Sequence, residues 1–393
     1  MNKKDVAAIR KQFKPDNDRL NITDIFNVYV IKESSDVLYQ ENRPFSMLDP
    51  DQQELFFNNF KKVLGGQLDE KLFQLKFQRE AENHSQLILH KGLLASNAED
   101  WKEDMLQLVE KMFATTQYEM DVVVTFIKGE YFKPTKESNG ADDESVMNTV
   151  YSHSFILCSI NQTELPKKNL LFDFVEREFK YNVVVDPIIN LSSPVAGFLF
   201  PCFIDNAADV NHILYSASKP NQPDYHFIEH VLNSQEITTA KENKEIFEEI
   251  VREVTGDNID TTILSNVYEE INRVIEEAEE EGPQLDYKDV ERVLKVSGVE
   301  GVNTEKVEMA FQKVVDDERY ELKASSIMPN YKTKSIKINT KVANISISPQ
   351  DLKYVKQVNY NGKKCILIEV DEDMEIEGFK LWDTGTGTLS HNQ

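Results

Sequence analysis

EMDVVVTFIKGEYF, residues 119–132, is a run of β-branched and aromatic side chains and predicts a long strand. The chain around it holds more runs of this kind. We expect further strands at residues 22–32, 71–77, 86–90, 150–161, 196–204 and 210–217. Helical spacing predicts helices at residues 2–13, 50–64, 98–114 and 223–233. Because strands outnumber helices without alternating regularly with them, we expect residues 1–235 to form an α+β domain with a mixed, largely antiparallel sheet.

The predicted helix at residues 50–64 has an inward stripe that ends at Gly65-Gly66. The residues expected to face inward are Leu55, Phe56, Phe60 and Val63. The first helix, residues 2–13, places Val6, Ile9 and Phe13 on one stripe. Its basic residues are Lys3, Lys4, Arg10 and Lys11. Two interpretations stay open for it: a helix docked on its own domain, or a basic helix that binds a membrane or nucleic acid.

From about residue 240 the spacing of apolar residues becomes helical. Residues 236–320 are expected to form an acidic helical segment, with later helices at residues 286–297 and 304–317. Two apolar stripes mark its first helices, and the acids lie on the opposite faces. The stripes are Ile246, Phe247, Ile250, Val251 and Val254, then Ile263, Leu264, Val267, Ile271, Val274 and Ile275. The acids are interpreted as the solvated side of a helical bundle.

Residues 321–383 are expected to form a small lysine-rich β module, followed by a disordered tail at residues 384–393. YVKQVNY and KKCILIEV flank Asn361-Gly362. This dipeptide supplies the positive φ angles of a type I′ turn and therefore predicts a hairpin.

Charge is divided by sign along the second half of the chain. The 393 residues carry a formal net charge of −24, and the pI is about 4.8. Residues 236–281 hold fifteen Asp and Glu against four Lys and Arg. Residues 331–364 hold eight Lys against one acid, Asp351. The overall acidity argues against wholesale coating of nucleic acid, because polyanions repel such a surface outside one local basic contact.

Three cysteines, Cys158, Cys202 and Cys365, lie far apart in apolar runs. Their spacing does not match a zinc ribbon, and buried thiols in a reducing cytosol fit it best. The N-terminus is basic but lacks the apolar core of a signal peptide. No run reaches the roughly 20 apolar residues that a membrane-spanning helix needs. We therefore expect a cytoplasmic protein without a membrane partner.

Residues 226–230, HFIEH, match the H-x-x-E-H pattern of inverted zincins. On a helix, His226 and His230 lie one turn apart and could share one Zn²⁺, with Glu229 polarising a metal-bound water. A pattern with three fixed letters has low specificity, and two histidines on the outer face of a docked helix need no ligand. Zinc is the one cofactor that the sequence suggests, as an alternative to having none.

Asp205 and Asp209 follow a predicted strand, together with Asn211 and His212. The end of a strand is a common position for functional side chains. These carboxylates could hold Mg²⁺ or act as an acid–base pair, or they could cap a turn. The turn is the favoured interpretation.

The lysines of residues 331–364 are the candidate binding patch. They are Lys332, Lys334, Lys337, Lys341, Lys353, Lys356, Lys363 and Lys364. Basic strands with interleaved aromatics can follow a phosphate backbone, and Tyr354 and Tyr360 are nearby aromatics. The lysines could also dock on acidic helices of the same chain or of a partner, or they could keep exposed sheet edges soluble.

No phosphate-binding loop, dinucleotide fingerprint or nucleophile elbow occurs in the chain. The leading hypothesis is therefore a non-catalytic binding or regulatory protein that acts through charged surfaces and associates with itself or with another protein. The alternatives are a metal-dependent hydrolase built on His226, Glu229 and His230, and a nucleic-acid-binding protein that uses the lysine patch.

Five segments carry a resemblance to a known family. They are MNKKDVAAIRKQFKPDN (1–17), RPFSMLDPDQQELFFNNFKKVLGGQLDEKLFQLKF (43–77), FILCSIN (155–161), GFLFPCFIDNAADVNHILYSASKP (197–220) and NGKKCILIEVDEDMEIEGF (361–379). The chain resembles an uncharacterised family of Gram-positive bacterial proteins that is catalogued as a domain of unknown function. The resemblance implies a bacterial cytosolic protein and brings no catalytic residue or cofactor to carry over.

Overall fold

A computed structural model describes most of the chain. It covers residues 1–79, 84–114, 116–134, 150–165, 168–183, 186–204, 207–278, 282–317, 319–328, 336–370, 374–376 and 379–380. Asp205, Lys332, Lys334 and the predicted tail at residues 384–393 lie outside the described residues. The chain divides into two compact units, residues 1–238 and residues 239–393.

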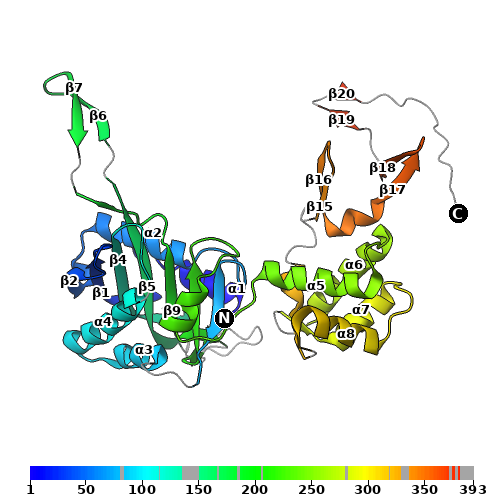
Figure 1. Cartoon of the computed structure of the whole chain (residues 1–393). Helices are drawn as coiled ribbons and strands as arrows, with labels where there is room; N and C mark the ends of the chain where they lie inside the picture. The colour runs from blue at the N-terminus through cyan, green and yellow to red at the C-terminus, as the bar shows by residue number, and fades with distance from the viewer. Residues whose placement is uncertain are drawn as a thin grey trace, which may run out of the picture. The chain divides into compact units, whose positions relative to one another are not determined.

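The first unit is built on an eight-stranded sheet (Figure 1). Its strands are β1 (Leu20–Val30), β2 (Val37–Pro44), β3 (Leu72–Lys76), β4 (Val122–Pro134), β5 (Val150–Glu164), β8 (Ile188–Ile189), β9 (Ala196–Phe200) and β12 (His212–Ala217). The spatial order is β2-β1-β4-β5-β9-β12-β3, and β8 pairs with β5. Every pairing in this sheet is antiparallel, which confirms the predicted α+β class.

Helices cover both faces of the sheet. On one face lie α1 (Lys3–Arg10), the 3₁₀ turn η1 (Phe45–Met47) and α2 (Pro50–Val63); on the other lie α3 (Ser85–Leu94) and α4 (Ala98–Ala114). Successive strand residues enter opposite cores, because side chains alternate across a strand. Phe126 packs with α3 and α4, whereas Ile127 packs with α1 and α2. The two-sided burial explains why β4 is almost continuously apolar.

Two predictions on this unit are wrong. Residues 86–90 are not a strand but part of α3, whose N-terminus is capped by His84 through the Gln86 amide. A short apolar run has no period that separates a strand from a buried helix, and the burial of Leu89 and Gly92 follows helical spacing. Leu55 is exposed rather than inward, and Phe57 is buried in its place.

Smaller elements complete the first unit. They are the hairpins β6 (Lys168–Asp173) with β7 (Glu178–Val183) and β10 (Cys202–Ile204) with β11 (Ala207–Asp209), and the π-helical turn η2 (Phe227–Val231). The β6–β7 hairpin was not predicted. Phe227, Ile228 and Val231 bury one side of the η2 turn in the α3–α4 core.

The second unit begins with a helical bundle, as predicted. Its helices are α5 (Ala240–Thr255), α6 (Thr261–Glu277), α7 (Tyr287–Val296), α8 (Thr304–Val315) and the short α9 (Ala324–Ile327), with a strand pair β13 (Gln284–Leu285) and β14 (Leu322–Lys323). Phe247, Ile250 and Ile271 are buried in one core. Among the helices that the structure describes, none is both long and apolar enough to cross a bilayer.

Short strand pairs follow the bundle. They are β15 (Ile336–Asn339) with β16 (Asn344–Ile347), β17 (Val355–Tyr360) with β18 (Lys363–Ile368), and β19 (Glu375–Ile376) with β20 (Phe379–Lys380). Asn361 and Gly362 have φ angles of 51° and 73°, so the predicted turn is confirmed. The 3₁₀ turn η3 (Pro349–Tyr354) packs on α6, and Leu352 enters the bundle core.

Candidate functional site

A hollow of about 780 Å³ in the first unit is lined by cationic side chains. Arg10, Lys11 and Lys14 come from the end of α1 and the residues after it. Lys61 and Lys62 come from the last turn of α2, and Lys71 precedes β3. The remaining lining residues are Ala7, Gly65 and Gly66, so no acid lines the hollow among the residues that the structure describes. We call these six basic residues the cationic pocket.

Amphipathic helices bring the six cations together. Val6 and Ile9 bury the inner side of α1, and Phe60 and Val63 bury that of α2 in the same core. The residues between these anchors must face solvent, which turns Arg10, Lys61 and Lys62 outward.

The turn after α2 brings Lys71 to the pocket. Gly66 has a φ of +121°, a conformation that side chains other than glycine rarely adopt. A Cβ atom at Gly66 would lie 2.8 Å from the Cβ of Lys71. Glycine therefore permits both the sharp turn and the close approach of Lys71.

Repulsion between the cations is not fully compensated inside the chain. Within the described residues, none of the six forms an ion pair with a carboxylate. Burial lowers the pKa of Lys71, and the positive charge of Lys62 lowers it further. The C-terminal carbonyls of α1 and α2 favour cations in the last helical turn, but Lys14 and Lys71 lie outside both helices. An anion in the pocket would relieve this repulsion.

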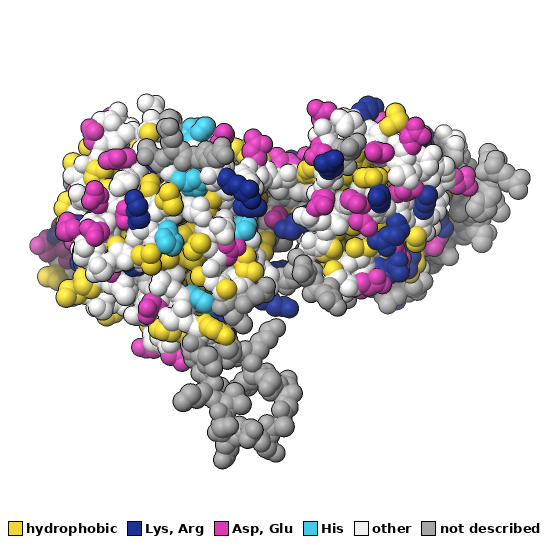
Figure 2. Space-filling model, turned by 90° about the horizontal axis from the view of Figure 1, so that it is seen from below, with side chains coloured by type: hydrophobic (Ala, Val, Ile, Leu, Met, Phe, Trp, Pro, Cys, Tyr) yellow, Lys and Arg dark blue, Asp and Glu magenta, His cyan; other side chains and the backbone are white. Residues whose placement is uncertain are grey.

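His226 and His230 lie on the exposed side of the η2 turn, with their ring centroids 4.6 Å apart. Glu229 lies beside His230, with 3.8 Å between Oε2 and Nε2. Figure 2 shows histidine side chains gathered on one face of the first unit. In the described part of the chain, no group of three or more His, Cys, Asp and Glu is arranged to hold a metal ion. The structure brings the two predicted imidazoles together without a third ligand among these residues.

Asp209 stabilises the turn between β11 and β12. Its carboxylate accepts hydrogen bonds from the Asn211 amide at 2.9 Å and from His212 Nδ1 at 2.6 Å. Burial opposes ionisation of Asp209, but these hydrogen bonds prevail and lower its pKa.

His212 also borders a hollow of about 580 Å³ lined by Lys76, Arg79 and His84, among others. His84 is held by its cap, since its Nδ1 accepts from the Gln86 amide.

The described lysines of the predicted patch lie on several small elements. Lys337 is on β15, Lys356 on β17, and Lys363 and Lys364 on β18. Lys356 is paired with Glu369 at 2.8 Å, and the Lys353 amine lies 5.2 Å from the ring centroid of Tyr354. The described lysines therefore come from several separate elements, and one of them is already paired with an acid.

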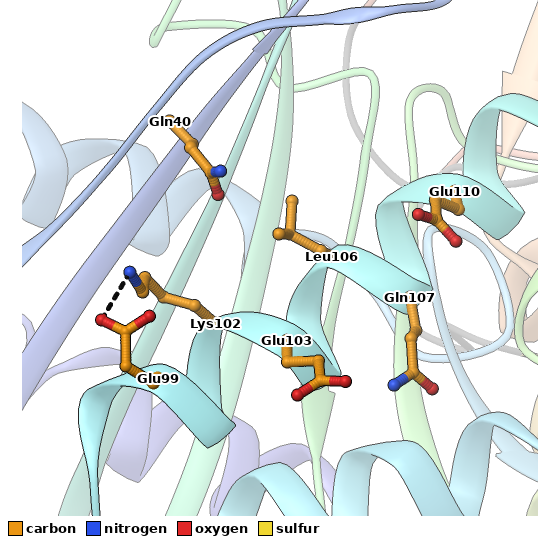
Figure 3. A pocket seen from close by; sticks show the side chains of 7 residues that line it. All are labelled: Gln40, Glu99, Lys102, Glu103, Leu106, Gln107 and Glu110. Carbon is orange, nitrogen blue, oxygen red and sulfur yellow. Dashed lines mark ion pairs between the residues drawn. The ribbon is translucent and has the colours of Figure 1, made fainter.

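A third hollow has the opposite charge (Figure 3). It is lined by Glu99, Lys102, Glu103, Leu106, Gln107 and Glu110 of α4 and by Gln40 of β2. Glu99 pairs with Lys102 at 2.8 Å. A cluster of acids on one exposed helix face is the ordinary solvated side of an amphipathic helix, so this hollow does not indicate a ligand.

Sequence reasoning missed the cationic pocket. The sequence pattern singles out the basic residues of the first helix but does not connect Lys61, Lys62 and Lys71 with them. The usable signal was a lysine pair directly before Gly65-Gly66, at the end of a helix whose other side is apolar.

Comparison with known proteins gives a family assignment without an activity. The model of a family described as a domain of unknown function (DUF4317) matches residues 1–379. No curated protein matches the chain.

Proposed function

The chain belongs to the DUF4317 family, and from its surface we propose that it is a binding protein whose cationic pocket takes a compact anion bearing several phosphates. The observation that carries the proposal is the convergence of six Lys and Arg from three separate segments on one hollow, whose described lining contains no acid. Lys and Arg are the side chains that proteins use for phosphate groups.

Size and charge favour a compact ligand over a long polyanion. A volume of about 780 Å³ lies within the range of roughly 300–1,000 Å³ that small-molecule pockets have. The chain as a whole carries −24, so a nucleic acid that extends beyond the pocket meets repulsion from the surrounding surface. A molecule of the size of a nucleotide, or a short inorganic polyphosphate, places its charges within reach of the six cations and avoids that cost.

Calorimetric titration of the full chain with sodium tripolyphosphate at low and high salt tests the proposal. We expect binding that weakens with salt and that falls about tenfold or more in the double variant Lys62→Gln/Lys71→Gln, since each charge-assisted contact contributes about 1.5–3 kcal/mol. Lys337→Gln/Lys341→Gln is the matched control, because it removes the same charge from exposed positions of the second unit.

The control also separates the pocket from the lysine patch. An absence of binding at low salt, or equal binding by the wild type and the pocket variant, contradicts the proposal. Fluorescence anisotropy with a labelled oligothymidine forms the second arm. If the oligonucleotide binds more tightly than tripolyphosphate and only the Lys337/Lys341 variant weakens it, nucleic-acid binding by the lysine patch replaces the proposal.

The hydrolase built on His226, Glu229 and His230 stays a prediction. A second function is not proposed for that turn, because no third metal ligand lies beside the two imidazoles among the described residues.

A further inference from the structure

The β6–β7 hairpin has two chemically different faces. In its register Leu170 pairs with Tyr181, Phe172 with Phe179, Leu171 with Lys180, and Asp173 with Glu178. Directly opposed residues share a face and successive pairs alternate. One face therefore carries Leu170, Phe172, Phe179 and Tyr181, and Phe174 extends it from the turn. We call these five residues the aromatic face.

The aromatic face is exposed. The exposed fractions are 67% for Leu170, 42% for Phe172, 85% for Phe174, 72% for Phe179 and 61% for Tyr181. Contacts among the rings cover only part of their surface. Phe172 packs edge to face with Phe174 and Phe179, with ring centroids 5.2 and 5.3 Å apart. A contiguous apolar patch of this kind on a soluble chain marks an interaction surface.

The charged side chains of the opposite face already form ion pairs within the hairpin. Lys180 contacts Asp173 at 2.8 Å, Glu176 at 2.7 Å and Glu178 at 3.5 Å. Hydrogen bonds from Lys180, Glu176 and Val175 lower the pKa of Asp173, so this carboxylate stays ionised at neutral pH. These ion pairs need no outside partner. A two-stranded hairpin is only marginally stable in water. Packing of another surface against the aromatic face would supply further stabilisation.

We infer that the aromatic face is the interface of a two-fold dimer in which the hairpins of two copies pack face to face. A two-fold contact uses the same patch on both copies, so the patch must complement itself. Among the side chains that the structure describes, the aromatic face carries only apolar and aromatic groups, so it meets this condition. The charged opposite face does not, because three acids surround a single lysine there.

The available area is sufficient for such a dimer. With about 150–250 Å² of surface for each aromatic side chain, the exposed fractions amount to roughly 600 Å² on each copy. Two copies would bury roughly 1,200 Å² in total, which reaches the lower end of stable interfaces.

Charge argues against a bilayer as the occupant. The whole chain carries −24, and the anionic surface of a membrane repels such a chain.

Sedimentation equilibrium of the full chain over a wide concentration range, at low and high salt, tests the dimer. We expect reversible dimerisation that high salt does not weaken, because apolar burial is not screened. Phe174→Ser should weaken dimerisation about tenfold or more, and Phe172→Ser/Phe179→Ser should abolish it. Phe174 lies in the turn and is 85% exposed, so its replacement leaves the strand pairing intact.

Two matched controls keep the test specific. Leu171→Ser alters the opposite face of the same hairpin, and Tyr39→Ser removes an aromatic residue of β2 that is 62% exposed. Both variants should dimerise like the wild type. A monomer at every concentration, a dimer unchanged by Phe174→Ser, or a dimer that dissociates in high salt overturns the inference. Flotation of the chain with anionic vesicles that depends on Phe174 also overturns it, in favour of a membrane surface. None of these outcomes depends on anion binding by the cationic pocket.

Discussion

The side-chain amine of Lys111 on α4 donates a hydrogen bond to the hydroxyl of Ser85 at the start of α3, with 2.7 Å between Nζ and Oγ. The Ser85 hydroxyl in turn donates to the carbonyl of Val231, and the Asn233 side-chain oxygen also accepts from Lys111. This partly buried network ties both helices to the η2 turn that carries the histidine pair. Burial lowers the pKa of Lys111 from 10.5 to about 8.

The lowered pKa makes the stability of the first unit depend on pH. Below pH 8 the amine is protonated in both states, and the folded state bears the cost of burying the charge. Between pH 8 and 10.5 the unfolded chain binds more protons, so the free energy of unfolding rises with pH there. Lys111→Met should remove this rise, which we expect to be about 1–2 kcal/mol because the half-buried amine is partly screened by solvent.

Urea unfolding of the wild type and Lys111→Met at pH 7 and pH 9.5 measures the effect as a difference between two proteins. Taking the difference cancels the contribution of Cys158, whose buried thiol has a raised pKa in both. Lys337→Met should behave like the wild type. Parallel pH profiles for Lys111→Met and the wild type would show that Lys111 titrates normally.

In the cationic pocket, Lys62→Met should raise the pKa of Lys71, because it removes a positive charge that lowers this pKa. Burial is the larger cause of the shift, so the pKa of Lys71 should stay below 10.5. Saturating tripolyphosphate should raise it as well. Carbon NMR titration of labelled lysine side chains reports the value directly. Lys14→Met is the control and should leave the pKa of Lys71 unchanged. An equal effect of both variants would mean that the pKa of Lys71 responds to the total charge of the pocket and not to Lys62 in particular.

Zinc should bind only weakly to His226 and His230. Two imidazoles supply half of the usual four ligands, and no third protein ligand lies beside them in the described residues. Elemental analysis of the purified chain should find less than stoichiometric zinc, and EDTA should not change the melting temperature. Stoichiometric zinc that is lost in His226→Ala would instead support the metal-dependent hydrolase.

Gly197→Ala should destabilise the first unit by about 1–3 kcal/mol, as overpacking of a dense core does. An added Cβ would lie 2.6 Å from the Cys158 carbonyl on β5 and 2.7 Å from a Val63 methyl on α2. The backbone of a central strand cannot yield. Thermal unfolding measures the loss. Gly298→Ala, where the new Cβ meets open space, should cost only the roughly 1 kcal/mol of its unfavourable φ.

Leu352→Ala should destabilise the second unit by about 2–4 kcal/mol and expose the η3 turn to proteolysis. Leu352 is 3% exposed and is the side chain through which η3 enters the helical core. Val342→Ala is the control, since Val342 is 95% exposed and its loss should leave both readouts unchanged. Equal proteolysis of both variants would show that the β pairs hold the turn without Leu352.

Local sequence patterns are sufficient to predict the elements whose burial follows one clear period. The run of β4 is apolar on both faces, and α5 and α6 carry unbroken stripes, so local pattern and final environment agree. Local patterns also predict the turn at Asn361-Gly362, because a positive φ is a local property of these residues. The prediction of a strand at residues 86–90 is wrong for the opposite reason. Five residues fit a strand and a buried helix equally well, and only the contacts with α4 decide between the two.

The two proposed binding surfaces depend on tertiary packing and on strand register. Arg10 lies far in sequence from Lys61 and Lys71, and their charges share a pocket because α1 and α2 pack on the same face of the sheet. The aromatic face depends on the register of β6 and β7, since a shift by one residue would move Phe172 and Phe179 to opposite sides of the hairpin. Local patterns choose helix or strand, whereas the position of a charge or a ring relative to distant residues is set by packing and register.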